Sequence, residues 1–257
     1  MVGAVSQAME ILEILVDSPD GAGVSDLSSR LGINKGSTSR LLSTLEDDGF
    51  LARNPDTGRY VLTMKLLALA NRLTDRLGFP ASAQPILNRL AGEVGELIQL
   101  LAGDGEQLYV IAKAEGDARI AVKSLMGRVM ALHASAGGKA WLSAFPLDEA
   151  TRMVARQGTQ SLTERTVTDL GSLRAELDRA SGLGYAVQDE ELMPHVAAIA
   201  VPIRHRVTGV PLGAIDIVAP AFRFPLERRL GFLLPLKAAA AEIMAIWPDG
   251  FFQLASG

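Results

Sequence analysis

Residues 31–62 read LGINKGSTSRLLSTLEDDGFLARNPDTGRYVL. Gly32 interrupts one helix, and Asn34, a favoured N-cap residue, predicts the start of another that runs to about Asp48. The turn residues Asn-Pro-Asp-Thr-Gly at 54–58 then separate two short apolar segments, 50–52 and 60–62. This spacing is typical of a β-hairpin.

Two more helices are predicted before this stretch. The apolar residues of segment 8–15 recur at helical spacing, and the sequence Ser-Pro-Asp-Gly at 18–21 ends that helix. Ser25 is predicted to cap a short second helix that ends at Gly32. Helix, helix, tight turn, helix and hairpin in this order predict a winged helix-turn-helix, whose third helix is free to enter the major groove of DNA.

The outward positions of the predicted third helix and of the hairpin carry short polar and basic side chains. Such side chains suit base edges and phosphates better than they suit a packed core. The predicted DNA-contacting residues are Lys35, Gly36, Ser37, Ser39, Arg40, Ser43 and Thr44 in the helix, and Arg53 and Arg59 in the hairpin. The alternative is a solvated helix face with an incidental charge pattern, but the turn and hairpin at the expected spacing favour DNA binding.

The composition excludes several other classes of protein. The 257 residues include 25 Lys+Arg and 29 Asp+Glu, a formal charge of −4, which taken alone argues against nucleic acid as a partner. However, residues 30–45 contain three bases and no acid. The absence of cysteine excludes disulfides, thiolate zinc sites and cysteine nucleophiles. No uncharged run approaches the roughly 20 residues that span a bilayer, so we expect a cytoplasmic protein without a membrane segment.

A stripe of leucines at three-to-four spacing runs from Met64 to Leu77 and predicts a connecting helix. This helix either packs on its own domain or pairs with a second copy of the chain. The sequence Gly-Phe-Pro at 78–80 marks the end of the connection. We therefore expect a DNA-binding domain over 1–64, a linker helix over 65–78 and a larger domain over 79–257.

Strands and helices are predicted in mixed order within the larger domain. The expected strands cover residues 97–102, 107–112, 119–125, 185–188, 197–205 and 212–218. The expected helices cover residues 84–94, 135–145, 148–156, 169–181 and 226–246. The pattern predicts an α+β sensor domain built on a six-stranded mixed sheet.

With these elements in place, the sequence resembles the IclR family of bacterial transcription regulators over nearly its whole length. The motifs that carry the resemblance are AMEIL at 8–12, LGINK at 31–35, RLLSTL at 40–45, DTGRY at 56–60, LHASAGGKA at 132–140, GYAV at 184–187 and IAVP at 199–202. The resemblance implies a GAF-like C-terminal domain that binds a small organic acid or an aromatic effector. It also implies dimers on pseudo-palindromic double-stranded operator DNA, with tetramers common, and no cofactor.

The resemblance further implies an effector site between the sheet and the loop after the Leu-His-Ala-Ser segment, where main-chain N–H groups near Ala136 and Gly137 face a ligand carboxylate. The implied pocket residues are Val122, Leu132, Ser135, Ala136, Gly137, Gln188, Val196, Ala198, Asp216 and Val218. The alternative is a helix start that is packed tightly for structural reasons alone.

The chain departs from the family pattern at several pocket positions. Gln188 stands where Asp is common, His195 where Gly is usual, Ala198 where Cys is frequent, and Asp216 and Val218 where Ser is often found. We expect Asp216 to repel a bare 2-oxo acid and to accept a hydrogen bond from a phenol, amide, hydrazide or amine. The alternative is that Asp216 pairs with Lys123 or another base.

Motifs of the common enzyme classes are missing from the sequence. The segment 135–139 does not match a P-loop, and neither a G-x-S-x-G elbow nor an H-E-x-x-H zinc motif occurs. The three histidines are far apart, so we expect neither a catalytic nor a metal site. A third reading is a DNA-architecture protein with a vestigial pocket, and an effector-dependent change in operator affinity would distinguish the regulator from it. The operator, the effector and the direction of regulation stay open.

Overall fold

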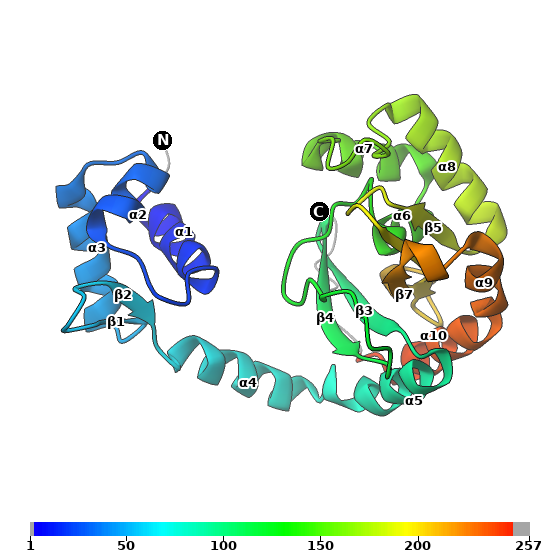
Figure 1. Ribbon diagram of the computed structural model, residues 1–257, viewed down its shortest axis with the longest axis horizontal. Coiled ribbons are helices and arrows are strands. Elements are labelled where there is room, and N and C mark those ends of the chain that lie inside the picture. Colours follow the sequence, from blue (N-terminus) through cyan, green and yellow to red (C-terminus); the bar gives the residue numbers. More distant parts are fainter. Residues whose placement is uncertain (1–2, 249–257) are drawn as a thin grey trace. The chain divides into compact units, whose positions relative to one another are not determined.

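The computed structural model describes residues 3–248 of the chain. They form two compact units, one that ends at Arg76 and one that begins at Leu77 (Figure 1). The division falls near the end of helix α4 (Lys65–Leu77). Among the described residues, no helix is both long and apolar enough to cross a membrane.

The first unit is a three-helix domain with a β-hairpin. Its elements are α1 (Ala4–Val16), α2 (Val24–Leu31), α3 (Lys35–Asp47), β1 (Leu51–Arg53), β2 (Tyr60–Leu62) and α4 (Lys65–Leu77). Ile11, Leu27 and Leu42 lie fully buried at the centre of its core. These residues come from the three helices, so the predicted apolar faces do converge.

The turn between α2 and α3 forms as the sequence predicts. Gly32 ends α2 in the left-handed conformation at φ +65°, which glycine adopts without steric cost. The Asn34 side chain caps α3 by accepting a hydrogen bond from the Ser37 N–H at 2.9 Å. The prediction for Ser25 was wrong, because α2 begins at Val24 after Gly23, whose N–H donates to the Asp26 carboxylate at 3.4 Å. That carboxylate serves as the cap, so a serine is not needed.

A short extended segment at Ala22, in the loop between α1 and α2, pairs with strand β2 of the hairpin. Ala22 and Tyr60 exchange two backbone hydrogen bonds, 3.0 and 2.9 Å long. Gly21 permits this approach, since a Cβ atom there would lie 2.4 Å from the Tyr60 carbonyl oxygen. The hairpin is thus held against the loop between α1 and α2.

Helix α4 leaves its apolar stripe uncovered. No side chain of α4 is buried, and Leu67 and Leu73 are each 55% exposed. Only Leu66, at the start of the helix, packs against the core of the first unit. Packing on its own domain therefore does not account for the leucine stripe.

The second unit is built on a sheet whose strand order is β4-β3-β7-β6-β5. Its strands are β3 (Leu97–Asp104), β4 (Gln107–Ala114), β5 (Ala186–Asp189), β6 (Val196–Arg204) and β7 (Pro211–Pro220). Its helices are η1 (Ala81–Ala83), α5 (Gln84–Val94), α6 (Ala136–Leu142), α7 (Leu147–Gln157), α8 (Leu170–Leu183), η2 (Ala221–Arg223), α9 (Leu226–Gly231) and α10 (Leu233–Ile246).

Helices cover both faces of this sheet (Figure 1). Helices α5 and α10 pack on one face over a core that includes Leu100 and Ile217. On the other face, α6, α7 and α8 pack over Leu101 and Ala214. The central strand β7 is consequently buried along almost its entire length, and the side chain of Asp216 shares the α6 face because Ala214, Asp216 and Val218 alternate along the strand.

The predicted α+β class is confirmed, but three details of the prediction were wrong. Residues 119–125 form no strand, so the sheet has five strands. Every pairing in it is antiparallel, so the sheet is not mixed. The last helix is interrupted at Phe232, between α9 and α10. Pro235 explains the break, because proline fits the first turn of a helix but not its interior.

Candidate DNA interface and effector pocket

Helix α3 presents two adjacent rows of small polar and basic side chains to solvent. Residues 35, 39 and 43 form one row at i, i+4 spacing, and residues 36, 40 and 44 form the other. Lys35, Gly36, Ser39, Arg40, Ser43 and Thr44 are all exposed, and Ser37 is partly exposed. The opposite side of the helix is buried through Leu42 and Leu45. The rows thus contain no large apolar group, which leaves the helix able to lie against a polar surface.

The two hairpin arginines differ in how they are held. Arg59 is engaged inside the domain: Nη2 donates to the Gly21 carbonyl at 2.6 Å, and Nε donates to the Asp20 carbonyl at 3.1 Å. Arg53 is exposed and makes one 3.3 Å bond to the Gly58 carbonyl. Arg59 therefore clamps the hairpin to the α1–α2 loop, a role that the sequence did not indicate, while Arg53 keeps most of its donors free.

In the second unit, a cavity of about 30 Å³ lies between the sheet, the start of α6 and the loop after β5. Residues from six separate segments line it: Leu97, Gln99, Val122, Lys123, Leu125, Met130, Ser135, Ala136, Gln188, Leu192, Met193, Val196, Ala198, Asp216 and Val218. The structure brings all the predicted pocket residues to this cavity except Leu132 and Gly137, which are buried beside it in the packing around α6. The volume suits about two water molecules, so a larger ligand has to displace the covering loops.

Asp216 is the most unusual group in the cavity wall. It is 2% exposed, and its Oδ1 atom has no hydrogen-bond partner among the described residues. Burial raises the pKa of Asp216 to about 8, although a backbone hydrogen bond with Gln99 opposes the shift. No ion pair among residues 3–248 includes Asp216, so the alternative, a pair with Lys123, does not form even though Lys123 lines the same cavity. A pKa raised in this way favours the protonated carboxyl group at pH 7, and this opposes the repulsion of an anion that the sequence led us to expect.

The start of α6 packs closely on the sheet. A Cβ atom on Gly137 would lie 2.9 Å from a Leu101 methyl carbon and 3.3 Å from Asp216 Oδ2. A Cβ atom on Gly138 would lie 2.6 Å from the Leu132 carbonyl oxygen. Ser135 caps the helix by accepting the Gly138 N–H at 3.0 Å. The glycines are therefore required by packing, and the tight helix start that was the alternative to a ligand site is present together with the cavity.

A polar network stands behind the cavity and was not visible in the sequence. The Gln188 side chain donates to the Val196 carbonyl at 3.1 Å and accepts the Glu191 N–H at 3.0 Å. Glu191 in turn accepts two hydrogen bonds from Lys139 Nζ, at 2.8 and 2.9 Å. Burial raises the pKa of Glu191, although Lys139 opposes the shift. The network fixes the loop after β5, which supplies Leu192 and Met193 to the cavity wall.

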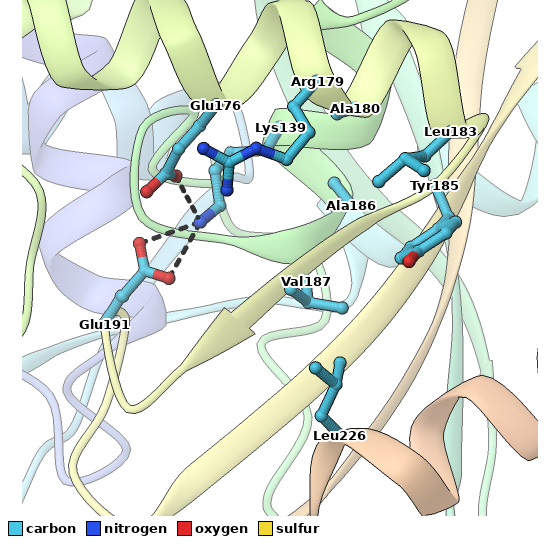
Figure 2. A pocket seen from close by; sticks show the side chains of 10 residues that line it. All are labelled: Lys139, Glu176, Arg179, Ala180, Leu183, Tyr185, Ala186, Val187, Glu191 and Leu226. Carbon is cyan, nitrogen blue, oxygen red and sulfur yellow. Dashed lines mark hydrogen bonds and ion pairs between the residues drawn. The ribbon is translucent and has the colours of Figure 1, made fainter.

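The same lysine lies in the wall of a second hollow, with a volume of about 240 Å³. Figure 2 shows Lys139 between Glu176 and Glu191, with Tyr185 on the other side of the pocket. Lys139 is 4% exposed and pairs with both glutamates, at 3.0 and 2.8 Å. Its charge is therefore satisfied by the protein itself.

A metal-binding constellation is not found in the part of the chain that the structure describes. No group of three or more His, Asp or Glu side chains is arranged to hold a metal ion there. His133 is buried near α6, whereas the side chain of His195 is 92% exposed and lies 3.4 Å from Glu190. His195 adopts φ +63°, the left-handed region that favours glycine, and this agrees with a loop position where glycine is usual.

Several cavity residues were missed by the sequence reading. Gln99 lies beside Asp216 because β3 and β7 are paired in that register. Leu125 reaches the cavity from the segment that was predicted to be a strand, and Met130 from the loop that follows that segment. Leu192 and Met193 come from the tight loop between β5 and β6. Their positions depend on the register of the strands and on the conformation of the loops, and the pattern of the sequence predicts neither.

Comparisons with known proteins agree with this geometry. The model of the IclR helix-turn-helix domain matches residues 4–55, and that of the bacterial transcriptional regulator IclR C-terminal domain matches residues 71–245. The chain is 32% identical to the HTH-type transcriptional regulator KipR of Bacillus subtilis, over 93% of this chain and 94% of KipR.

Two solved structures share the fold over nearly the full length. The first is an IclR transcriptional regulator from Silicibacter sp. TM1040, with a TM-score of 0.82 and 26% identity, covering 96% of this chain and 97% of that one. The second is an IclR homolog of Microbacterium hydrocarbonoxydans complexed with 4-hydroxybenzoate, with a TM-score of 0.78 and 25% identity, covering 95% of this chain and 99% of that one.

The family models together span most of the chain, and the relatives they group it with are named as transcriptional regulators rather than as enzymes. The exposed polar rows of α3 beside a β-hairpin are the arrangement that such a DNA reader needs. The chain therefore belongs to the IclR family and is a DNA-binding transcriptional regulator.

Proposed function

We propose that this regulator binds a pseudo-palindromic operator and that a small organic acid, an aromatic acid or a derivative of one changes its operator affinity from the cavity beside Asp216. The observation that carries the proposal is the buried, unpartnered carboxyl oxygen in the wall of that cavity. A buried polar atom without a partner is costly unless a ligand or water satisfies it.

In the proposed complex, α3 lies in the major groove. Arg40 reads a base edge, while Lys35 and Arg53 contact phosphates and supply salt-dependent affinity. The serines and the threonine of the two rows are short enough to let the helix approach the bases. Arg59 acts indirectly, by holding the hairpin in place through Gly21.

A homodimer, or a tetramer made of two such dimers, is part of the proposal. The exposed leucines of α4 support it, because an uncovered apolar stripe at helical spacing is typical of a helix that pairs with another. Two copies related by a twofold axis present two α3 helices, which matches a pseudo-palindromic site. A cytoplasmic location is part of the proposal, because the protein acts on such DNA.

The effector class is supported by the walls of the cavity and by one relative. The wall combines apolar side chains with the amides of Gln99 and Gln188 and with Lys123, a mixture suited to an amphiphilic acid. The Microbacterium relative was solved with 4-hydroxybenzoate. A ligand of that size has to push Met193 and the loop around Leu125 outward.

Footprinting on the DNA upstream of the protein's own gene tests the proposal. The full-length protein is expected to protect two half-sites about one helical turn apart, or a multiple of that spacing. A panel of glyoxylate, pyruvate, benzoate and 4-hydroxybenzoate is then titrated into the complex. A shift in operator affinity with at least one acid is expected, and this shift is to disappear in an Ala198→Trp variant, whose side chain fills the cavity.

Two outcomes would contradict the proposal separately. Protection without any effect of ligands would favour a DNA-architecture protein with an unused cavity. An effect of ligands that survives in Ala198→Trp would place the effector elsewhere. Far-UV circular dichroism is the control, since the variant must keep the native secondary structure and its fluorescence would include the added tryptophan.

A further inference from the structure

The side chain of Asp216 forms no ion pair with any residue that the structure describes. Among the residues that line the cavity, only Asp216 and Lys123 are titratable, and these two form no ion pair. Oδ1 of Asp216 is buried without a hydrogen-bond partner, and the whole residue is 2% exposed. The carboxyl group is therefore surrounded by protein, and its Oδ1 atom has no hydrogen-bond partner.

Each element packed against Asp216 faces it with neutral groups. β3 contributes Gln99, and β6 contributes Ala200 from the paired register position. α6 contributes Gly137, and β5 contributes the amide of Gln188 to the same cavity. The loop before α6 brings Lys123, the single charged side chain that reaches this space. Lys139 and Glu191 lie behind Gln188 and neutralise each other.

This environment favours the neutral form of the carboxyl group. Burial raises the pKa of Asp216 to about 8, and the backbone hydrogen bond with Gln99 opposes the shift only in part. Oδ1 is the oxygen that accepts nothing, so it is the oxygen that holds the proton. The group thus presents an O–H donor that lacks an acceptor.

A neutral Asp216 changes the charge that a ligand meets. The cavity wall then carries only the positive charge of Lys123, which favours an anion. A carboxylate oxygen beside Oδ1 would accept the unused proton in a charge-assisted hydrogen bond, which is stronger than a neutral one. An amide N–H or an ammonium in the same place would leave that proton without an acceptor.

We propose that Asp216 selects an anionic organic acid by donating a hydrogen bond from its protonated carboxyl group, so that effector binding in alkaline solution takes up one proton. The inference rests on the proposed effector site and adds its charge specificity and its proton linkage. No covalent bond of the ligand changes: where Asp216 is ionised before binding, one proton passes from solvent to its carboxylate as the acid enters.

The test uses calorimetric titration of the full-length protein between pH 6.5 and 9.5 with acetate, pyruvate and benzoate, and with acetamide and benzamide as neutral analogues. The acid that binds most tightly at pH 7 is expected to bind about tenfold more weakly for each pH unit above the pKa. At pH 7 the protein should also bind this acid more tightly than it binds the corresponding amide. The heat of binding at pH 9 should vary with the ionisation enthalpy of the buffer, which reports the uptake of one proton.

Asp216→Asn provides the matched variant. Its side-chain amide keeps the shape and a permanent N–H donor, so the affinity for the acid should no longer depend on pH. Asp216→Ala lacks the donor and should bind the same acid weakly at all pH values. The carboxyl carbon of Asp216, followed by ¹³C NMR in the unliganded protein and assigned through Asp216→Asn, should titrate near pH 8.

The outcomes separate this inference from the proposed function. Binding of an acid with unchanged affinity between pH 7 and 9, tighter binding of the amides, or a carboxyl group that titrates near its ordinary value would each overturn the role of Asp216 and leave the effector site in place. Failure of every acid and amide to bind would overturn the effector site itself, and the inference with it.

Discussion

Lys139 Nζ lies 2.8 Å from Glu191 Oε1, and this buried ion pair joins α6 to the loop after β5. The two residues are 52 positions apart in the sequence. Glu191 also donates its N–H to the Gln188 side chain, which belongs to the cavity wall. The ion pair therefore fixes the loop that carries Leu192 and Met193 over the cavity.

Lys139→Met should destabilise the second unit, because it leaves the buried Glu191 carboxylate without its cation. Breaking a buried ion pair from one side costs about 3–5 kcal/mol. The double variant Lys139→Met with Glu191→Gln removes both charges and should be more stable than the single variant. Urea unfolding at pH 7.5, followed by the fluorescence of Trp141, measures both. A double variant that is as unstable as the single one would show that the pair is not the cause.

Arg40→Ala should weaken binding to the operator by about 1–3 kcal/mol if the guanidinium reads a base, and should relax the base preference at one position. Arg40→Lys is the matched control, since lysine keeps the positive charge but cannot form the bidentate hydrogen bonds of a guanidinium group. Fluorescence anisotropy with operator and unrelated DNA compares them. Wild-type affinity in Arg40→Lys would mean that Arg40 contacts phosphate only.

Arg59→Ala should loosen the hairpin of the first unit, because its guanidinium donates to the carbonyls of Asp20 and Gly21. Hydrogen bonds from a charged donor contribute roughly 1.5–3 kcal/mol each when buried, and less here because Arg59 is partly exposed. Amide hydrogen exchange in β2 should become faster. Arg53→Ala, with a single exposed bond to Gly58, should leave this exchange nearly unchanged. Reduced DNA affinity with unaltered exchange in Arg59→Ala would instead indicate direct DNA contact.

The helical elements and most strands could be predicted because they depend on local signals. Asn34 caps α3 with its own side chain, and Gly32 ends α2 through its own left-handed backbone. Residues 119–125 misled the prediction because their alternating pattern indicates extended backbone but not a partner strand. In the folded domain three of them line the cavity. Val129, further along the same loop, forms an isolated bridge with Tyr109.

The residues of the candidate site were predictable only in part, and its chemistry was not. Alternation along β7 placed Asp216 on the face that carries the cavity, and the resemblance named half of the other residues that line the cavity. Lys123 lies on a loop and is separated from Asp216 by about 90 residues in the sequence. Whether the two side chains pair depends on the path of that loop, which no local sequence pattern encodes. The clamp by Arg59 is hidden for the same reason, because Gly21 is 38 residues away.

The two glycines of α6 give a matched pair of packing predictions. A Cβ atom on Gly138 would meet the Leu132 backbone oxygen at 2.6 Å, so the backbone would have to move. On Gly137 the nearest atom is a Leu101 methyl carbon, which can rotate away. Gly138→Ala should therefore cost about 1–3 kcal/mol and Gly137→Ala less. Thermal unfolding checks the order, and a larger loss in Gly137→Ala would contradict the close contact of Gly138.

Asp216→Asn should raise the free energy of unfolding at neutral pH, by an amount that grows with pH. The pKa of Asp216 is about 8 in the folded protein and about 3.9 in an unfolded chain. The folded state therefore binds one more proton between these values, and its stability falls as pH rises, by about 1.4 kcal/mol per pH unit at most. Below about pH 4 both states are protonated, and above about pH 8 both are ionised, so the difference between variant and wild type is then constant. Asparagine does not titrate and retains an oxygen for the Gln99 backbone. Urea unfolding of both proteins at half-unit steps from pH 5 to 9 measures the difference, and a difference that stays flat through this range would mean that Asp216 is ionised in the folded domain.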